Sequence, residues 1–422
     1  MRQKGSSPVS HGTDLVACSV IAKNYLAHAR VLSESFLKHN SNSKLYVLLA
    51  DKIDGYFNPS EEQFQIVTLD DLEKEILDLL TPQFLFSHNV YEYSTAVKAL
   101  FLEYLLNKVD IRKLVFLDPD ILVTDSFRDI DKLLNQYSII LTPHFTEPIK
   151  DELANQLNQT EVNVLLNGVY NLGFLAIAKT DTTVSFLDWW KKHLHRCCFM
   201  DPENGIFVDQ KFMDLVPGMF DNVYVLRYPG YNVANWNVLD RCLIFKGNHY
   251  YVNNKPLVFF HFSNFDPEKM DKVSEYAALK IAELSPDYRN MFKVYRDLLY
   301  ASGYQTVKDW PLSYGFFNNG VAVPDIARKI YRESVDLQRR YPDPFSTSEA
   351  ANYFNWLNSD VKSQDEKPII TQLWHEVYRR RIDVQKVFPD IFGDNRVAFT
   401  EWIMNYGSKE FKVDSAFLPF NI

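Results

Sequence analysis

The chain has 422 residues, a formal net charge of -9 and 46% hydrophobic residues. At about 150 residues per domain, this composition predicts a globular protein of two or three domains. A nucleic-acid partner is not expected, because such proteins present a basic surface. The four cysteines are too few for a disulfide framework, and the N-terminal residues lack the apolar core of a secretion signal. Both features favour the reducing cytoplasm.

Strands and helices are expected to alternate along the first part of the chain. Near-continuous apolar runs, typical of strands buried on both faces, lie at 15–22, 44–51, 63–69 and 113–118. Apolar residues recur at helical spacing in 24–39 and 95–106. Short connections between these elements predict an α/β domain with a mostly parallel sheet.

The pattern loosens after about residue 127. Further strands are expected at 138–145, 168–178 and 256–263, with a helix at 186–197. From about residue 268 long amphipathic helices are expected, such as 272–285 and 287–302. The predicted organisation is a flexible tail at 1–13, an α/β domain at 14–267 and a mainly helical C-terminal domain at 268–422.

Two carboxylates follow the apolar strand at 113–118. In parallel sheets, ligands bind beyond the carboxyl ends of the strands, so Asp118 and Asp120 should lie at the rim of the sheet. This Asp-x-Asp could hold one Mg²⁺ or Mn²⁺, which prefer oxygen ligands, and the cation could bind a diphosphate. A turn is an equally good interpretation, because Asp and Pro favour turns.

Two further interpretations concern the same region. An aspartyl-nucleophile phosphatase also uses an Asp-x-Asp after an apolar strand, but here the pair follows the fourth expected strand, and no second acid follows Gly393-Asp394 at the required spacing. His261, after another apolar strand, could supply a nitrogen ligand or could be a structural histidine.

The ordered set of YLAHARVLSESFLKH, YEYSTAVKALFLEYLL, VFLDPDILV, NLGF, VDQ and HFSN resembles bacterial glycosyltransferases of the GT-A fold. The most similar group is the sugar-nucleotide-dependent family 8-like enzymes, and the resemblance covers about residues 14 to 267. It implies Mn²⁺ or Mg²⁺ bound by Asp118, Asp120 and His261. Where the family has a diphosphate-binding Gly-and-Lys pattern, this chain has Ser263 and Asn264.

The resemblance also implies residues around the donor sugar. Lys98 matches a basic residue that touches the donor, although it could be a solvated helix lysine. Asn171 matches a position facing the donor sugar, and Gly173 would let a ligand approach the backbone. Asp209 and Gln210 match an acid–amide pair beside the sugar hydroxyls, although Asp209 could instead be a helix N-terminal carboxylate.

Other expected contacts are weaker. His144 should lie near the same rim, and Trp236 with Asn237 could contact a sugar face or lie in the core. The first strand, including Val16 and Ala17, would hold the nucleotide base, and Asp51 would meet the base or ribose.

The implied activity is transfer of a hexose from a nucleoside diphosphate sugar, with UDP favoured, to an acceptor hydroxyl with retention of configuration. The acceptor would be a glycan, a lipid-linked sugar or a protein in bacterial surface glycan synthesis. The alternative is a non-catalytic sugar-nucleotide- or glycan-binding protein.

The C-terminal third has two basic clusters, Arg339-Arg340 and Arg379-Arg380-Arg381. They could contact an anionic lipid headgroup at the inner face of a membrane. The favoured interpretation is a solvated helix face balanced by Glu376 and Asp383. The helical region could also form a homodimer or close over the acceptor.

Overall fold

The computed structural model describes residues 15–72, 78–107, 111–150, 161–275, 277–361 and 369–419. The chain divides into two compact units. The first contains residues 1–73 and 94–310, and the second contains residues 74–93 and 311–422. The second unit therefore combines a short segment from the first quarter of the sequence with the C-terminal residues.

A seven-stranded sheet forms the centre of the first unit, with the strand order β10-β6-β7-β4-β1-β2-β3. Its strands are β1 (Leu15–Ile21), β2 (Leu45–Leu49), β3 (Gln65–Val67), β4 (Lys113–Leu117), β6 (Ile139–Pro143), β7 (Tyr170–Ala178) and β10 (Val223–Val225). β1 is parallel to β2 and β4, whereas β7 runs antiparallel between β4 and β6. The predicted α/β class with a mostly parallel sheet is confirmed.

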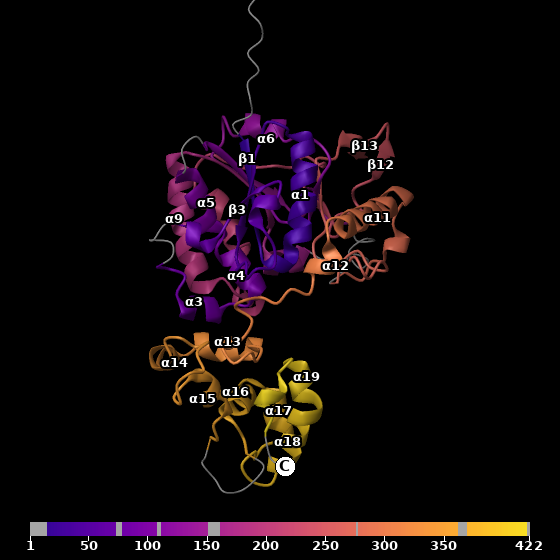
Figure 1. Cartoon of the computed structure of the whole chain (residues 1–422). Coiled ribbons are helices and arrows are strands. Elements are labelled where there is room, and N and C mark those ends of the chain that lie inside the picture. Colours follow the sequence, from indigo (N-terminus) through magenta and orange to yellow (C-terminus); the bar gives the residue numbers. More distant parts are fainter. Residues whose placement is uncertain are drawn as a thin grey trace, which may run out of the picture. The chain divides into compact units, whose positions relative to one another are not determined.

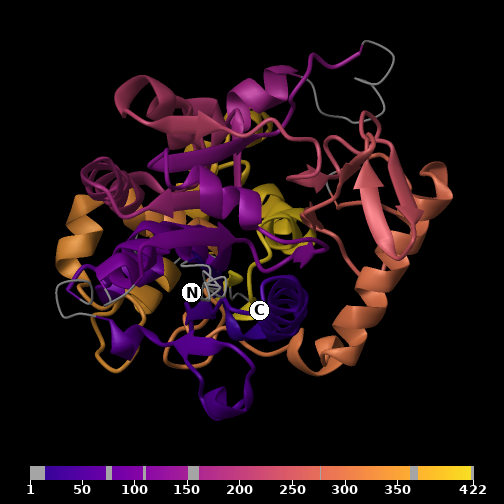
Figure 2. The same cartoon turned by 90° about the horizontal axis from the view of Figure 1, so that it is seen from above.

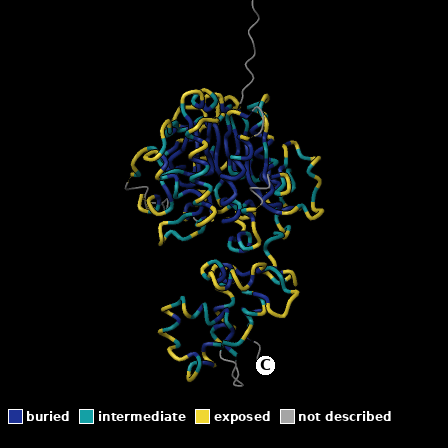
Figure 3. The backbone as a smooth tube through the Cα atoms, turned by 90° about the vertical axis from the view of Figure 1, so that its left-hand side faces the viewer, coloured by how far each residue is buried: buried dark blue, intermediate teal, exposed yellow. Residues whose placement is uncertain are grey.

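Helices flank this sheet (Figure 1). In α1 (Leu26–His39), the residues at helical spacing, Leu26, Ala29, Leu32 and Phe36, are fully buried, as the pattern predicted. α5 (Lys98–Asn107) is buried along most of its length, because it packs against both β4 and α9 (Asp181–Cys197). The strands of this sheet consist mostly of buried residues, and Figure 3 draws buried residues in dark blue.

A smaller sheet brings a late segment of the chain to the acid pair. It has the order β11-β15-β5, formed by β5 (Ile121–Val123), β11 (Val233–Ala234) and β15 (Phe259–His261). β5 and β15 are antiparallel, and His261 lies opposite Ile121. This pairing places His261 beside Asp120 in space.

A hairpin sheet of β12 (Leu243–Lys246), β13 (His249–Val252) and β14 (Lys255–Pro256) lies beside α11 (Pro286–Ala301) (Figures 1 and 2). The backbone amide of Phe245 donates to Asp287 across this contact, with a nitrogen–oxygen distance of 3.1 Å. The remaining helices and strands of the first unit are α4 (Val90–Ala96), which begins in the second unit, α6 (Arg128–Leu133), α8 (Glu161–Asn167), β8 (Met200–Asp201), β9 (Ile206–Phe207), α10 (Val216–Met219) and α12 (Tyr304–Val307).

The helix expected at 272–285 is wrong for the described residues of this segment. The structure has a single 3-10 turn there, at Ile281–Glu283. Ala277, Leu279 and Ile281 are buried, whereas residues 278 and 280 are exposed. That alternation has the period of an extended chain, and the buried residues join the apolar cluster that contains Phe292 of α11. Tertiary packing therefore outweighs the local helical spacing.

The two units divide after Trp310, whereas the sequence pattern places a boundary near residue 268. The difference arises because α11 contributes Met291, Phe292 and Tyr295 to an apolar cluster that also contains Val31 of α1. Residues 268–310 thus pack with the α/β unit.

The second unit is built from short helices around its own apolar core, which includes Phe86, Tyr331, Tyr353 and Trp374. Its helices are α3 (Pro82–Ser87), α13 (Asp325–Arg332), α14 (Val335–Arg340), α15 (Tyr353–Asn358), α16 (Gln372–Arg380), α17 (Ile382–Val387), α18 (Arg396–Trp402), a π-helical turn (Ile403–Gly407) and α19 (Ser408–Glu410). The predicted C-terminal helices are therefore present, but they are short.

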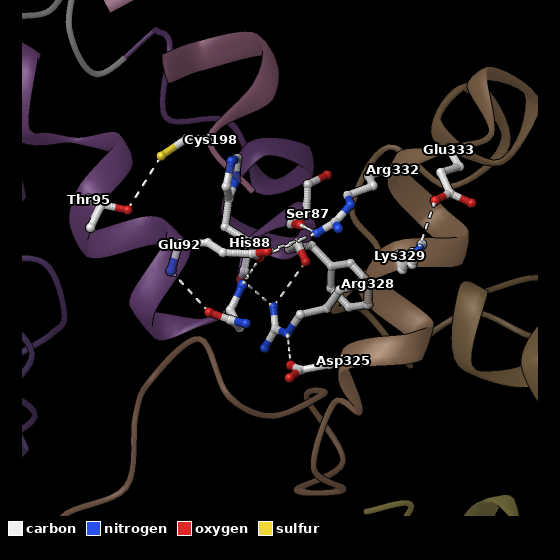
Figure 4. Close-up of polar contacts among 12 residues, drawn as sticks. Ser87, His88, Glu92, Thr95, Cys198, Asp325, Arg328, Lys329, Arg332 and Glu333 are labelled. Atoms are coloured by element: carbon white, nitrogen blue, oxygen red, sulfur yellow. Dashed lines mark hydrogen bonds and ion pairs between the residues drawn. The ribbon is translucent and has the colours of Figure 1, made fainter. Parts of the chain in front are cut away.

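Arg328 connects the segment that contains Phe86 and His88 to the C-terminal helices within this unit (Figure 4). The buried guanidinium donates to the carbonyls of Phe86, His88 and Tyr314 at 2.9, 3.0 and 2.7 Å. Arg332 forms an ion pair with the Glu92 carboxylate at 3.3 Å. The bonds to Phe86 and His88 satisfy backbone acceptors at the end of α3, which has no intrahelical donors for its last carbonyls.

Candidate metal and donor site

Asp118, Asp120 and His261 lie together beyond the carboxyl end of β4. One ligand atom from each residue lies within 4.8 Å of the other two. His261 Nε2 is 3.1 Å from Asp120 Oδ1 and 3.9 Å from Asp118 Oδ2. Two carboxylate oxygens and one imidazole nitrogen suit Mn²⁺ or Mg²⁺, with further positions left for ligand or water oxygens.

The backbone fixes both acids. The Asp118 amide donates to the Gly173 carbonyl of β7, and the Asp120 carbonyl accepts from the Phe262 amide, each at 2.9 Å. Burial alone would lower the pKa of His261, but Asp120 and then Asp118 outweigh burial and raise it. Burial would likewise raise the pKa of Asp120, and the neighbouring His261 instead lowers it. The three groups therefore interact strongly.

Lys98 lies beneath this cluster and is 4% exposed, so it is not a solvated helix lysine. Its ammonium is 3.1 Å from Asp118 Oδ1, 2.9 Å from Asp209 Oδ2 and 3.2 Å from the Leu172 carbonyl. Burial opposes the charge of Lys98, but Asp118 and Asp209 outweigh burial and raise its pKa. Three acceptors match the three ammonium N–H groups. The side chain is therefore committed to protein contacts.

Asp209 is 2% exposed and lies on the strained loop before a 3-10 helix at Lys211–Leu215. The preceding Val208 has a φ of 39°, which a β-branched residue rarely adopts. Such strain persists where surrounding structure imposes it, often at functional sites. The Asp209 carboxylate points to Lys98 rather than capping the helix, so the interpretation as a helix N-terminal carboxylate is not supported.

Asn171 and Gln210 form one hydrogen-bonded network with His261. His261 Nδ1 is 3.2 Å from Asn171 Oδ1, and Asn171 Nδ2 donates to Gln210 Oε1 at 3.2 Å. The Gln210 amide group donates to the Asn167 carbonyl at 2.9 Å. Both side chains thus support the histidine from behind.

Gly173 leaves room for the His261 ring. A Cβ at this position would lie 2.3 Å from His261 Cε1 and 2.6 Å from its Nδ1. The expected close approach at Gly173 therefore occurs, but the group that approaches is a protein side chain.

His144 and Trp236 lie on the other side of His261. The Trp236 ring packs edge-on against both His144 and His261, with ring centroids 5.0 and 5.4 Å apart. Burial lowers the pKa of His144 to about 4. The Asn237 amide donates to the backbone carbonyls of His144 and Asn232, at 3.2 and 3.0 Å. Trp236 is thus a buried wall of the site, and Asn237 fixes the turn that carries it.

Of the residues expected to contact the nucleotide, Asp51 lies at the edge of the sheet that carries Asp118, whereas Val16 and Ala17 do not. Asp51 follows β2 at the same edge as Asp118, and it forms a buried ion pair with Lys23, whose Nζ lies 3.5 Å away. Ala17 is fully buried inside β1, with Leu45 as its partner in β2, so it has no surface to offer a base. Val16 lies beside it, at the opposite end of β1 from this edge. These two predicted contacts are not supported.

Lys23 was not singled out in the sequence. Its buried ammonium also lies 3.1 Å from Asp54 Oδ2 and 5.0 Å from the centre of the Tyr56 ring. The sequence does indicate that Lys23 and Asp51 lie close together, because they follow adjacent parallel strands, whose carboxyl ends meet at one edge.

Ser263 and Asn264 directly follow His261 and are more accessible than it is. Ser263 is partly exposed, Asn264 is exposed, and the Asn264 amide donates to Ser263 Oγ at 3.2 Å. Their part in binding a diphosphate stays a prediction.

The arginines of the cluster at 379–381 belong to ion pairs rather than to a free basic patch. Arg379 and Arg380 pair with Glu376, and Arg381 pairs with Asp383 at 2.6 Å. This arrangement matches the solvated, balanced helix face. Among the described residues, no helix is both long enough and apolar enough to cross a membrane.

Known proteins offer a limited comparison. The chain is 25% identical to YfnF, an uncharacterised protein of Bacillus subtilis (strain 168), over 269 residues, which are 61% of this chain and 84% of YfnF. No protein-family model matches the chain.

Solved glycosyltransferases are among the structures that resemble it. The galactosyltransferase LgtC, in complex with donor and acceptor sugar analogues, has a TM-score of 0.37 and 13% identity, over 68% of this chain and 95% of LgtC. The glycosyltransferase GlyE of Streptococcus pneumoniae TIGR4 has a TM-score of 0.39 and 14% identity, over 72% of this chain and 66% of GlyE. At these TM-scores, the geometry of the site is the stronger guide to function.

Proposed function

We propose that this chain is a metal-dependent glycosyltransferase that uses a nucleoside diphosphate sugar. The observation that supports this most is the group of Asp118, Asp120 and His261, whose ligand atoms lie within 4.8 Å of one another beyond the carboxyl end of a parallel strand. Ligands of α/β sheets bind at this edge. A hexose donor linked to UDP, and retention of configuration, are the finer proposals and follow the sequence resemblance.

The residues have distinct proposed tasks. Asp118, Asp120 and His261 would hold Mn²⁺ or Mg²⁺. When bound, the cation would neutralise the negative charge that develops on a departing diphosphate. Lys98 holds Asp118 and Asp209 in place through the ion pairs at 3.1 and 2.9 Å. Fixed charges of this kind can stabilise positive charge that develops at the sugar carbon, because these groups need not move during the reaction.

Thermal unfolding with a panel of nucleoside diphosphates, each with and without Mn²⁺, tests the binding part of the proposal. A ligand at about 100 times its Kd should add roughly 2.7 kcal/mol of stability. Stabilisation by one nucleotide that requires Mn²⁺ is expected. The absence of stabilisation by every nucleotide under both conditions would contradict the proposal.

Measuring the release of nucleoside diphosphate distinguishes a transferase from a binding protein. The chain should release nucleoside diphosphate from the matching sugar nucleotide by hydrolysis or transfer, and Asp120→Asn should abolish that release. Nucleotide binding without release of the sugar would favour the non-catalytic alternative. A phosphorylated aspartate at Asp118 would favour the phosphatase.

A further inference from the structure

Backbone groups fix the orientation of every side-chain amide behind His261. Gln210 Oε1 accepts from the Leu172 amide at 3.1 Å, and Gln210 Nε2 donates to the Asn167 carbonyl at 2.9 Å. An amide N–H can only donate and a carbonyl can only accept. Gln210 therefore has one allowed orientation in this network.

The same argument fixes Asn171. Asn171 Oδ1 accepts from the Gly173 amide at 3.2 Å, and Asn171 Nδ2 donates to Gln210 Oε1 at 3.2 Å. The oxygen of Asn171 is therefore the atom that faces His261 Nδ1, at 3.2 Å. Because this oxygen cannot donate, His261 Nδ1 must carry the hydrogen.

We infer that Asn171 and Gln210 are positioning residues that set the tautomer of His261. With the hydrogen on Nδ1, a metal that binds the neutral ring would take the lone pair of Nε2, the atom that lies 3.1 Å from Asp120 Oδ1 and 3.9 Å from Asp118 Oδ2. A metal requires this lone pair, and partners on the far ring nitrogen commonly supply such orientation. The inference rests on the proposed metal site and assigns Asn171 to the histidine instead of the donor sugar.

The burial of the network supports this role. Asn171, Gln210 and His261 are 7%, 7% and 3% exposed. The Asn171 and Gln210 side chains have their polar atoms in the bonds described above, and Gly173 brings the His261 ring against β7. An Asn171 contact with sugar would require these bonds to break.

The test is calorimetric titration of the full chain with Mn²⁺ alone. Asn171→Ala removes the acceptor and should weaken Mn²⁺ binding about 10–100-fold. Asn171→Asp retains an acceptor oxygen toward Nδ1 and should keep most of the affinity. Asn352→Ala is the matched control, because Asn352 is also a buried asparagine that bonds to backbone groups, but it belongs to the second unit; this variant should bind Mn²⁺ as the unmodified chain does.

A spectroscopic measurement checks the tautomer directly. Nitrogen-15 NMR of the Mg²⁺-saturated chain, with His261 assigned through His261→Gln, should show the hydrogen on Nδ1. If Asn171→Ala does not fold, Gln210→Glu, which removes the donor to the Asn167 carbonyl, should weaken Mn²⁺ binding to a smaller extent.

The outcomes separate the two proposals. Unchanged affinity in both Asn171→Ala and Gln210→Glu, equal losses in Asn171→Ala and Asn171→Asp, or a hydrogen on Nε2, would overturn the tautomer inference and leave the metal site intact. If the unmodified chain binds no Mn²⁺, both the metal site and this inference are wrong.

Discussion

Lys98 and Asp209 form a buried ion pair, with 2.9 Å between Nζ and Oδ2, although one lies on a helix and the other on a strained loop. The same ammonium reaches Asp118 at 3.1 Å. A single buried cation thus joins Asp118, an acid of the proposed metal site, to the acid on the loop.

Lys98→Met should destabilise the first unit. Removing one partner of a buried ion pair leaves an uncompensated charge and typically costs about 3–5 kcal/mol. Urea unfolding should show this loss. The double variant Lys98→Met with Asp209→Asn removes both charges and should recover part of it. Equal stability of the single and double variants would mean that the charge of Asp209 is not the source of the loss.

Asp120→Asn should weaken Mn²⁺ binding more than Asn171→Ala does, because Asp120 is a proposed ligand itself. The expected loss is at least about 100-fold, the upper end for partners that only orient a ligand. Calorimetry with Mn²⁺ measures it. The exposed Asp129, whose side chain pairs with Lys132 at 3.5 Å, supplies a control in Asp129→Asn. Equal affinity in both variants would place the metal elsewhere.

Gly173→Ala should displace the His261 ring, since the new Cβ would lie 2.3 Å from Cε1. Overpacking of this kind typically costs about 1–3 kcal/mol, and Mn²⁺ binding should fall with it. Gly218→Ala is the control, because a Cβ there meets no atom within 4 Å. Thermal unfolding compares the two, and a fully stable Gly173→Ala that binds Mn²⁺ normally would contradict the observed packing.

Stability should fall as the pH decreases from about 6.5 to about 4. Burial lowers the pKa of His28 from 6.5 to about 4, with the Asp120 charge opposing the shift. Between these values the unfolded chain binds a proton that the folded chain does not, so stability rises with pH across this window. The contribution of His28 is at most about 3 kcal/mol.

His28→Phe should reduce this pH dependence, because phenylalanine keeps the ring that stacks on Tyr25 at 4.5 Å but does not titrate. Urea unfolding at pH 4.5 and pH 7 measures the difference. An identical pH dependence in the variant would show that other groups account for it.

Arg328→Met should loosen the second unit, because hydrogen bonds to charged groups contribute about 1.5–3 kcal/mol each and this side chain donates to three carbonyls. Amide hydrogen exchange should increase in residues 82–93. Lys329→Met changes the next residue, whose side chain is 47% exposed, and should have little effect. Unchanged exchange in Arg328→Met would mean that the apolar core alone holds the segment.

The sequence predicted the sheet well because buried parallel strands are continuous apolar runs, as in 113–118. The resemblance to GT-A glycosyltransferases implied that Asp118, Asp120 and His261 would meet, although only the pairing of β5 with β15 explains how. The burial of Lys98 was missed, yet α5 is apolar on most sides, and such a helix is a buried one. Val208 carries no sequence signal, because its strain is imposed by distant contacts.

At 272–285 the sequence pattern predicted a helix that the described residues do not form. Spacing of apolar residues there fits a helix, and the burial pattern with period two appears only once the chain lies against α11. Local pattern alone does not contain that information.

The segment around Phe86 also limits which fragments of the chain can be produced as stable pieces. The backbone passes from one unit to the other at residues 73–74, 93–94 and 310–311, so the units are not modules arranged end to end. Phe86 is fully buried among Phe317, Tyr331 and Tyr353. A truncation after residue 310 would expose this ring and leave α3 without its core, and a stable α/β fragment would require excision of residues 74–93 as well.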